Sequence, residues 1–537
     1  MHNDTTPVLI VGGGLVGLST SLFLTQHGIP SLLVERHAST AIHPRARGIN
    51  FRTMELFREL GLEEQIRVAG TELINNRGIL IVETLAGTEL KRIAMAEPSR
   101  ESLDEISPTN WCLCAQDQSE PILLAAARQR GSDLRFSTEL VSFEQDDAGV
   151  TAIVADRADG ARRTIRADYL IAADGAASPI RNALGISRSG RGTLGHHLSI
   201  YFSAHLSDLV RGREFIVCQV ENPEVHGMFV AVNNTDLWLF SVPYAPERGE
   251  RPEDFPPKRC IDLIRKAIGL PQIALEIKSI LPWEAAIRVA DRFQQGRVFL
   301  AGDAAHQMPP TGAFGANTGI QDAHNLAWKL AAVLNGQAAP ALLATYEDER
   351  CPVARFTAEQ AGLRSATTSF DPSTANGTRL ADPLVVIVGY QYTSQAIIPE
   401  DEAPLPLDHL ELNGHPGRRI PHRWLERQGK RISTLDLFGS RFVLLAGTDG
   451  RTWRDAAHAI AARRGIDLDA YSVGSTGDLI DRDERWCTTY GVTSTGAVLV
   501  RPDGFVGWRT QGSEEPQERT LEWALDCLLC RVPHHAS

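Results

Sequence analysis

The sequence predicts an α/β protein in which a Rossmann-like nucleotide-binding domain is interrupted by a β-sheet domain and followed by a compact C-terminal domain. Three observations support this architecture. A glycine-rich turn at 12–17 lies between an apolar strand and a helical segment. Two later apolar strands end in acidic turns, at Asp174 and at Asp303. Between those two turns the apolar pattern becomes that of strands, which indicates an inserted domain.

The order of elements near the N-terminus is typical of a βαβ unit that binds a dinucleotide. An apolar strand at 7–11 and a helix with apolar spacing at 15–26 flank the turn, and a second strand follows at 31–34. The turn contains the three glycines of the pattern, Gly12, Gly14 and Gly17. They permit a tight turn, close approach of a pyrophosphate and close packing of helix on strand, while the helix N-terminus favours the phosphate charge. The second strand ends in Glu35, whose carboxylate can accept a hydrogen bond from a ribose hydroxyl.

The two acidic turns distinguish among dinucleotides. The strand at 169–175 ends in Asp174-Gly175, and the strand at 297–303 ends in Gly302-Asp303. Together with the glycine turn, these segments resemble the single-component FAD-dependent aromatic hydroxylases, also called group A flavoprotein monooxygenases, in the branch of phenol hydroxylases and aromatic polyketide hydroxylases. The likeness covers nearly the whole chain in the expected order. It extends to the segments 44–46 and 52–56, Gln116, 120–121 and the helix at 319–334.

The change in pattern along the chain divides it into four segments. We expect the first part of the FAD-binding domain at 1–186, a substrate-binding β-rich domain at 187–290, the second FAD-binding part with a helical connection at 291–400, and a C-terminal domain at 401–537. A cleft between the cofactor and substrate domains would be the natural pocket. The C-terminal order of strand, helix, strand, hairpin and closing helix resembles the thioredoxin-like domain of this hydroxylase branch, but 447–453 contains no cysteine where the redox pair would lie.

The cysteines near the C-terminus are interpreted as buried thiols rather than as a redox or metal site. Cys527 and Cys530 have C-x-x-C spacing, but they lie near the end of the closing helix among apolar residues. No further cluster of Cys and His joins them, so we expect no metal. A redox role for the pair is the alternative.

The composition restricts the classes of partner. With 66 acidic and 54 basic residues the formal net charge is −12, and no run of Lys or Arg occurs, which argues against nucleic acid and anionic membrane surfaces as partners. No apolar run is long enough to span a membrane. The first strand starts too close to the N-terminus to leave room for a signal peptide, so we expect a cytoplasmic location. We also expect a monomer or homodimer.

The resemblance implies a site for non-covalently bound FAD. It assigns Gly12, Gly14, Gly17 and Glu35 to the ADP half, Arg36 to a place beside it, Gln116 to the ribityl chain, Asp303 to the ribityl hydroxyls, and Asp174 with Gly175 to the pyrophosphate and the reduced nicotinamide. A carboxylate at a strand end suits the ribityl chain, because the hydroxyl groups of that chain need fixed acceptors. Arg45 matches the family arginine in the loop near the flavin and is favoured over Arg47, although both arginines could instead belong to a solvated loop.

A loop at 309–317, before the helix at 319–334, is the segment expected to face the flavin ring. Its amide groups and the helix N-terminus would stabilise the negative charge of reduced flavin. The residues assigned to the cofactor here are Pro310, Gly315 and Asn317. The candidate catalytic residues are Arg45, Pro310 and Gly312. His306 could act as a general base, but the resemblance assigns its position to the scaffold of the motif.

The activity implied by the resemblance is that of a flavin monooxygenase. NADPH or NADH would reduce FAD, and O2 would then form a flavin C4a-hydroperoxide that hydroxylates a phenolic substrate of the polycyclic aromatic polyketide type. A Baeyer–Villiger or epoxidising monooxygenase and a simple phenol hydroxylase are alternatives, and a flavin- or ligand-binding protein without turnover is the alternative from another class. Candidate substrate contacts are Trp238 and Phe240, which share one face of an expected strand, although aromatic residues in strands more often form the core.

Overall fold

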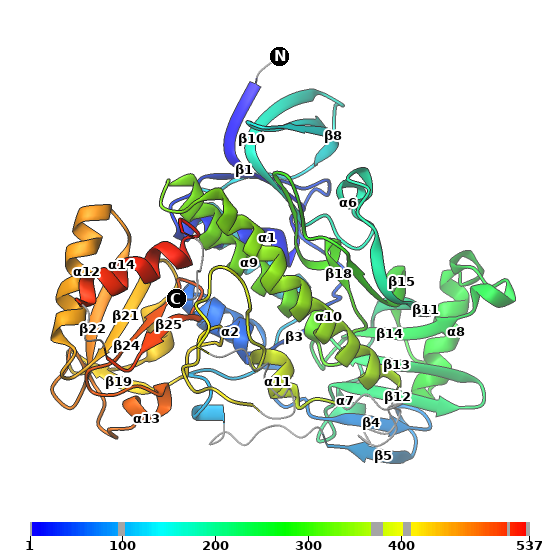
Figure 1. The fold of residues 1–537 in the computed structure, drawn as a ribbon. Helices are drawn as coiled ribbons and strands as arrows, with labels where there is room; N and C mark the ends of the chain where they lie inside the picture. The colour runs from blue at the N-terminus through cyan, green and yellow to red at the C-terminus, as the bar shows by residue number, and fades with distance from the viewer. Residues whose placement is uncertain (1–2, 95–102, 367–379, 401–409, 513–515, 533–537) are drawn as a thin grey trace.

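The first sheet carries the N-terminal βαβ unit at its centre. The computed structural model describes residues 3–94, 103–366, 380–400, 410–512 and 516–532 (Figure 1). Five parallel strands form the sheet in the order β17 (Val298–Leu300), β10 (Arg162–Ala172), β1 (Asn3–Val11), β2 (Ser31–Val34) and β7 (Asp133–Arg135). Antiparallel strands extend it, namely β16 (Gln294–Gln295) beside β17, and β9 (Gly149–Asp156) and β8 (Thr138–Asp146) beside β10. Val8, Leu9 and Ile10 in β1 are completely buried, as expected for a central parallel strand.

Helices cover this sheet and complete the cofactor domain. Helix α1 (Leu15–Gln26) has the predicted bounds and packs against α9 (Phe314–Leu334) and α5 (Gln116–Gln129). Helix α10 (Thr345–Ala366) lies along α9 (Figure 1). The shorter helices are α2 (Phe51–Glu59), α3 (Glu63–Ala69), α6 (Pro179–Ala183) and α11 (Pro383–Val388), and the short strands β3 (Gly48–Ile49) and β6 (Cys112–Leu113) pair with each other. Among the helices of the described residues, none is both long enough and apolar enough to cross a membrane.

A second sheet forms the inserted domain. Its strand order is β18 (His306–Gln307), β15 (Glu276–Ala290), β11 (Arg188–Ser203), β14 (Leu237–Tyr244), β13 (Val225–Ala231), β12 (Val217–Asn222), β4 (Ile79–Val82) and β5 (Glu89–Ile93). Helix α8 (Pro257–Ile268) covers one face of the sheet, and the short α7 (Ser207–Val210) follows β11. The core beneath α8 includes Leu198, Ile200 and Phe202 of β11, so alternate residues of that strand point to the other face.

Two strands of this sheet come from outside the segment 187–290. The sequence analysis assigns β4 and β5 to the cofactor segment 1–186, whereas β4 pairs in parallel with β12 and brings β5 with it. The apolar strand β4 is buried and satisfies the free hydrogen-bonding groups at the edge of β12. The cofactor and substrate segments are therefore more interleaved than the pattern of the sequence indicates, and the remaining boundaries stay predictions.

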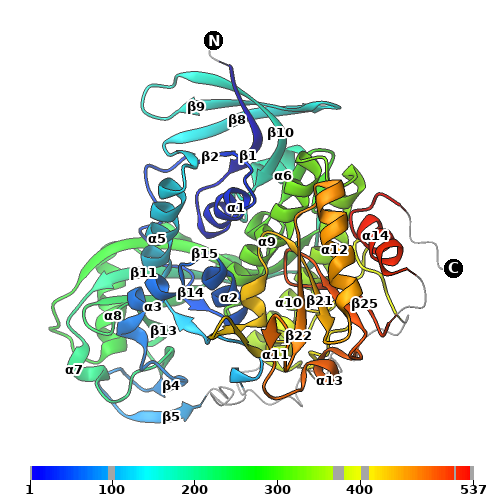
Figure 2. The same cartoon turned by 90° about the vertical axis from the view of Figure 1, so that its left-hand side faces the viewer.

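The C-terminal domain contains the third sheet. Its strand order is β20 (Lys430–Ser433), β19 (Trp424–Arg427), β23 (Leu479–Ile480), β22 (Leu468–Gly474), β21 (Phe442–Gly447), β24 (Ala497–Val500) and β25 (Val506–Thr510). Helix α12 (Arg451–Arg464) joins the parallel strands β21 and β22, and α13 (Trp486–Tyr490) leads to the antiparallel hairpin β24–β25. The closing helix α14 (Gln517–Leu528) packs against α12 (Figure 2). This is the thioredoxin-like arrangement, and the predicted fold class is confirmed.

The C-terminal domain packs directly on the cofactor domain. Its apolar core includes Trp328 and Ala332 of α9 beside Phe442 and Leu444 of β21. The rings of Trp328 and Phe442 meet edge-on, with their centroids 5.9 Å apart. The helix that follows the second acidic turn therefore contacts the C-terminal domain near its other end.

Candidate cofactor and substrate site

The turn after β1 requires glycine at two of its positions. Gly12 has φ +113°, and a Cβ there would collide with the carbonyl of Ala173 at the end of β10. A Cβ on Gly17 would collide with the carbonyl of Gly12. The turn therefore holds α1 closely against β1, with Gly14 at the helix N-terminus. That N-terminus has neither a side-chain cap nor an acidic residue in its first turn, so it can accept an anion.

Glu35 is held in place at the end of β2. Its Oε2 accepts a hydrogen bond from the Gly13 amide at 2.6 Å, and its Oε1 accepts one from the His37 amide at 2.8 Å. Because each carboxylate oxygen can accept more than one hydrogen bond, Glu35 keeps capacity for a hydroxyl group of a ligand. The neighbouring Arg36 is exposed and donates from Nε to Nε2 of His37, 3.3 Å away.

The two acidic turns meet the glycine turn at one edge of the sheet, because β10 and β17 are parallel to β1. Burial raises the pKa of the Asp174 carboxyl, and its Oδ1 is buried without a hydrogen bond to any described residue. The adjacent Gly175 has φ +85° and open space beside its Cα. Asp303 is exposed, yet desolvation by the protein around it raises the pKa of its carboxyl. His306 and Arg45 oppose this rise. Both carboxyl groups are therefore placed to accept hydrogen bonds from a ligand.

The loop at 41–47 crosses this edge and is tied to α5. The Ala46 amide donates to Gln116 Oε1 at 3.1 Å, and Gln116 Nε2 donates to Glu120 Oε1 at 2.6 Å. Glu120 Oε2 also accepts from the Ala41 amide at 2.8 Å, and burial raises the pKa of this carboxyl. The sequence analysis includes Glu120 only in a matching segment, because its contact with the loop joins residues 79 positions apart.

The two arginines of this loop have different surroundings. Arg47 donates to backbone carbonyls of the inserted domain, among them that of Ala231 at 2.7 Å, and burial lowers the pKa of Arg47 to about 10. Arg45 is exposed and makes no hydrogen bond or ion pair with the described part of the chain. Its charge nevertheless opposes the rise in the pKa values of the Glu120 and Asp303 carboxyls. This difference favours Arg45 as the residue that contacts a ligand.

The helix after the second acidic turn begins earlier than predicted. Helix α9 starts at Phe314, five residues before the predicted start, because Phe314 is buried and the Asn317 side chain fixes the first turn. Asn317 Oδ1 accepts from the Asn50 amide at 3.0 Å. Asn317 Nδ2 donates to the carbonyls of Gly48 at 2.9 Å and Ala313 at 2.5 Å. Both polar atoms of Asn317 are thus bound to this chain, and its contact with a cofactor stays a prediction.

The other candidate residues of this loop are at least partly accessible. Pro310 is exposed and Gly315 is half-buried, while Gly312 has φ +86° and a Cβ there would collide with a neighbouring ring. The N-terminus of α9 has neither a side-chain cap nor an acidic residue in its first turn, so its amide groups can face an anionic ligand. His306, by contrast, is completely buried with its Nε2 2.7 Å from Asp322 Oδ2, as expected for a residue of the scaffold.

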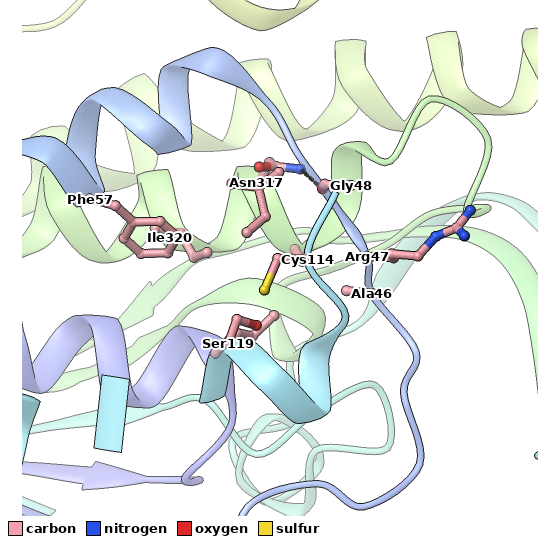
Figure 3. A pocket seen from close by; sticks show the side chains of 11 residues that line it. Ala46, Arg47, Gly48, Phe57, Cys114, Ser119, Asn317 and Ile320 are labelled. Atoms are coloured by element: carbon pink, nitrogen blue, oxygen red, sulfur yellow. Dashed lines mark hydrogen bonds between the residues drawn. The ribbon is translucent and has the colours of Figure 1, made fainter. Parts of the chain in front are cut away.

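A small pocket lies between the loop at 41–47, α5 and α9. In Figure 3, Asn317 and Ile320 lie on one side of it and Cys114 and Ser119 on the other, while the Arg47 guanidinium points away. The residues that line it are Leu15, Ala46, Arg47, Gly48, Ile49, Phe57, Cys114, Ser119, Ala316, Asn317 and Ile320. The lining is mostly apolar and includes first-turn residues of α1 and α9, whose N-termini are both open to an anion.

The predicted substrate contacts lie in the core of the inserted domain and not at the domain junction. Trp238 and Phe240 are completely buried beneath α8, and Trp238 Nε1 donates to the Ala204 carbonyl at 3.1 Å. Strand alternation indicates that the two residues share a face, but it does not indicate which face a helix covers. The opposite face of β14 carries Leu239, which packs with Ala115 of the cofactor domain.

The sequence analysis does not identify the polar residues on that opposite face. Ser199 of β11 and Ser279 of β15 lie there, and both are within hydrogen-bonding distance of His43 in the loop at 41–47. Nothing in the sequence links these residues, since 156 positions separate His43 from Ser199 and 236 separate it from Ser279.

Comparison with known proteins establishes the family. Residues 5–361 match the family described as FAD binding domain, and residues 413–531 match the family described as aromatic-ring hydroxylase, C-terminal. The chain belongs to the FAD-dependent aromatic-ring hydroxylases. It is an FAD-dependent monooxygenase, as its relatives are.

Full-length relatives agree with this membership. The hydroxylase is 48% identical to a putative polyketide hydroxylase of Streptomyces halstedii, over 97% of each chain. It is 43% identical to the tetracenomycin A2 monooxygenase-dioxygenase of Streptomyces glaucescens, over 99% of this chain and 98% of that one. The crystal structure of aklavinone-11 hydroxylase with FAD and aklavinone superimposes with a TM-score of 0.90 and 40% identity, over 99% of this chain and 100% of that one.

The residues of this hydroxylase fit FAD. The open N-terminus of α1 suits a pyrophosphate, and the unbonded oxygen of Asp174 and the exposed carboxyl of Asp303 offer acceptors to hydroxyl groups. Arg45, which has no partner in the described residues, can meet a negative charge. FAD, when bound, would supply the redox chemistry of the monooxygenase, while the residues of the protein would bind it, orient it and exclude water.

Proposed function

We propose that this hydroxylase uses NAD(P)H and O2 to hydroxylate a phenolic ring of a polycyclic aromatic polyketide. Relatives that match its full length include proteins named for polyketides, tetracenomycin and aklavinone, and one named for 4-methyl-5-nitrocatechol. The observation that carries the proposal is the face of the inserted sheet opposite α8, where Tyr201, Val230 and Leu239 form an apolar surface beside Ala115. Such a surface, next to the cofactor edge of the first sheet, suits a flat aromatic ring system.

The turns at the domain junction have distinct roles in this proposal. Glu35 accepts a hydrogen bond from the ribose and Asp303 from the ribityl chain, which positions the cofactor. The amide groups at the N-terminus of α9 stabilise negative charge on the reduced flavin ring. Gly312 allows the backbone of the loop at 309–317 to approach the ring closely. Arg45 supplies a positive charge at the same edge.

The test is NAD(P)H oxidation by the purified, FAD-loaded protein. Hydroxylated anthraquinones and related polycyclic phenols are expected to accelerate the oxidation and to gain one oxygen atom, as measured by mass spectrometry. Simple phenols form the comparison series, and NADPH is compared with NADH. Insertion of oxygen beside a carbonyl would assign Baeyer–Villiger chemistry instead. The proposal is wrong if no compound in either series accelerates oxidation or gains oxygen.

A further inference from the structure

The loop at 41–47 links the cofactor domain to the inserted domain. On the cofactor side its backbone amides bind side chains of α5. On the other side two of its own side chains, His43 and Arg47, bind the inserted sheet. Arg45 lies between these two residues in the chain and has no partner of its own among the described residues. The position of the Arg45 guanidinium therefore depends on how His43 and Arg47 are held.

His43 lies between two serine hydroxyl groups of the inserted sheet. Its Nδ1 is 2.7 Å from Ser279 Oγ in β15, and its Nε2 is 3.0 Å from Ser199 Oγ in β11. The imidazole also meets the ring of Tyr201 edge-on, with the centroids 5.9 Å apart. His43 is 5% exposed, and its three partners lie on the sheet face that α8 leaves uncovered. Both nitrogens of the imidazole are thus engaged with the substrate domain.

The hydrogen bonds of His43 differ in kind from those of Arg47. Burial and the positive charge of Arg45 lower the pKa of His43 to about 4, so its ring is neutral at neutral pH. A neutral imidazole donates from one nitrogen and accepts at the other, and a serine hydroxyl can do either. The serines keep capacity for a further hydrogen bond to a ligand. Arg47 instead binds backbone carbonyls, which cannot reorient.

We propose that His43 is a positioning residue that fixes the Arg45 loop to the substrate-binding face through Ser199 and Ser279. The inference rests on the proposed function, because it takes this face as the substrate side. A phenolic or carbonyl oxygen of the substrate above β11 and β15 shares the two hydroxyl groups with His43. Substrate binding on the sheet and the position of Arg45 are thereby coupled.

The experiment compares FAD-loaded variants by two independent measurements. His43→Ala removes both hydrogen bonds, whereas His43→Asn retains a polar atom near the position of Nδ1 and His43→Gln one near that of Nε2. The double change Ser199→Ala with Ser279→Ala removes both partners and leaves the imidazole in place. His226→Ala, at an exposed histidine of the same sheet, is the control. The first measurement is hydrogen exchange at the amides of residues 41–47, and the second is hydrogen peroxide released per NAD(P)H consumed.

In His43→Ala and in the double serine variant, the amides of residues 41–47 are expected to exchange about tenfold faster than in the parent. Both variants are also expected to release several times more peroxide per NAD(P)H. Their FAD affinity should stay within about twofold of that of the parent. The Asn and Gln variants recover part of the protection, and the control matches the parent. Unchanged exchange and unchanged peroxide release in folded His43→Ala would overturn the inference. If the parent oxidises no aromatic substrate, the proposed function fails, while the exchange measurement, which needs no turnover, still decides the role of His43.

Discussion

Two regions of this hydroxylase treat their charged side chains in opposite ways. At the interface with the C-terminal domain, Glu349 of α10 contacts Lys329 at 2.7 Å and Arg501 at 2.6 and 2.8 Å, and all three side chains are completely buried. At the cofactor edge, Arg45 and Asp303 are exposed, and Arg45 has no partner among the described residues. Buried charges need partners from the protein, whereas polar groups that stay open are available to a ligand. Charged side chains that find their partners within the protein are thus structural, whereas those without such partners are available to a ligand.

The largest expected effect comes from breaking the buried ion pairs at the interface with the C-terminal domain. Glu349→Gln leaves the buried charges of Lys329 and Arg501 without their shared partner, so we expect the free energy of unfolding to fall by about 3–5 kcal/mol. Denaturant unfolding of the apoprotein measures this fall in the free energy of unfolding. Asp348→Asn removes the same charge from an exposed neighbour on α10 and should change stability by less than about 0.5 kcal/mol. Equal losses in the two variants would show that the network does not stabilise the interface.

Variants at the cofactor edge should lose FAD affinity, and they should lose stability only where the side chain is also bonded within the protein. Asp303→Ala is expected to weaken FAD binding by about 1–3 kcal/mol, because hydroxyl groups lose their acceptor. The apoprotein should lose no stability, since the surrounding protein already disfavours the charged carboxyl. Glu35→Ala should weaken FAD binding by a similar amount and also destabilise the apoprotein, because Glu35 accepts from two backbone amides.

Fluorescence titration with FAD and denaturant unfolding separate these two quantities. Asp168→Ala, which removes an exposed carboxylate distant from the turns at the ends of β10 and β17, is the matched control. FAD affinity like that of the parent in both Asp303→Ala and Glu35→Ala would remove these residues from the cofactor site.

Acid should lower the stability of the C-terminal domain through its buried His422. Burial and the positive charge of Arg419 lower the pKa of His422 to about 3, while its Nδ1 lies 2.7 Å from Ser433 Oγ. An unfolded histidine titrates near pH 6.5, so the unfolded state binds more protons and stability falls as the pH drops below about 6.5. We expect His422 to contribute about 1 kcal/mol of that loss between pH 7 and pH 5.5.

His422→Asn keeps a polar atom near Ser433 and removes the titration, so the variant should lose less stability than the parent over the same pH interval. Unfolding curves of both proteins at the two pH values measure the difference. Identical pH dependence in the two proteins would mean that His422 titrates normally in the folded state.

The smallest expected effect concerns the cysteine pair. Cys527 is completely buried in α14, and burial raises the pKa of Cys530 to about 11, so the reactive thiolate is disfavoured. The double change Cys527→Ser with Cys530→Ser should leave turnover per bound FAD unchanged and lower stability by about 1–2 kcal/mol, because a hydroxyl group replaces a buried apolar thiol. A large fall in turnover per FAD in the folded variant would assign the pair to the reaction.

Features set by neighbouring residues could be predicted from the sequence. The bounds of α1 follow from its apolar spacing and from Gly28, and the placement of Asp174 and Asp303 at one edge follows from the parallel strands that precede them. The start of α9 could not be predicted, because two glycines in its first turns argue against a helix and distant contacts of Asn317 override them.

Features that depend on which surfaces meet could not be predicted either. The alternation along β14 groups Trp238 with Phe240, but only the position of α8 determines that this face is the core. The contacts of His43 and of Glu120 join residues that are far apart in the chain, and each residue type on its own is common in loops and helices.

The contact between Glu349 and Arg501 also constrains how the protein is made. The two residues are separated by 152 positions, so during synthesis α10 leaves the ribosome long before the partner of its buried carboxylate exists. Until then Glu349 and Lys329 must stay hydrated, and the helices that follow the loop at 309–317 cannot reach their final packing. A chain that stops before residue 501 therefore lacks the guanidinium partner of Glu349 and leaves the part of α9 around Trp328 uncovered.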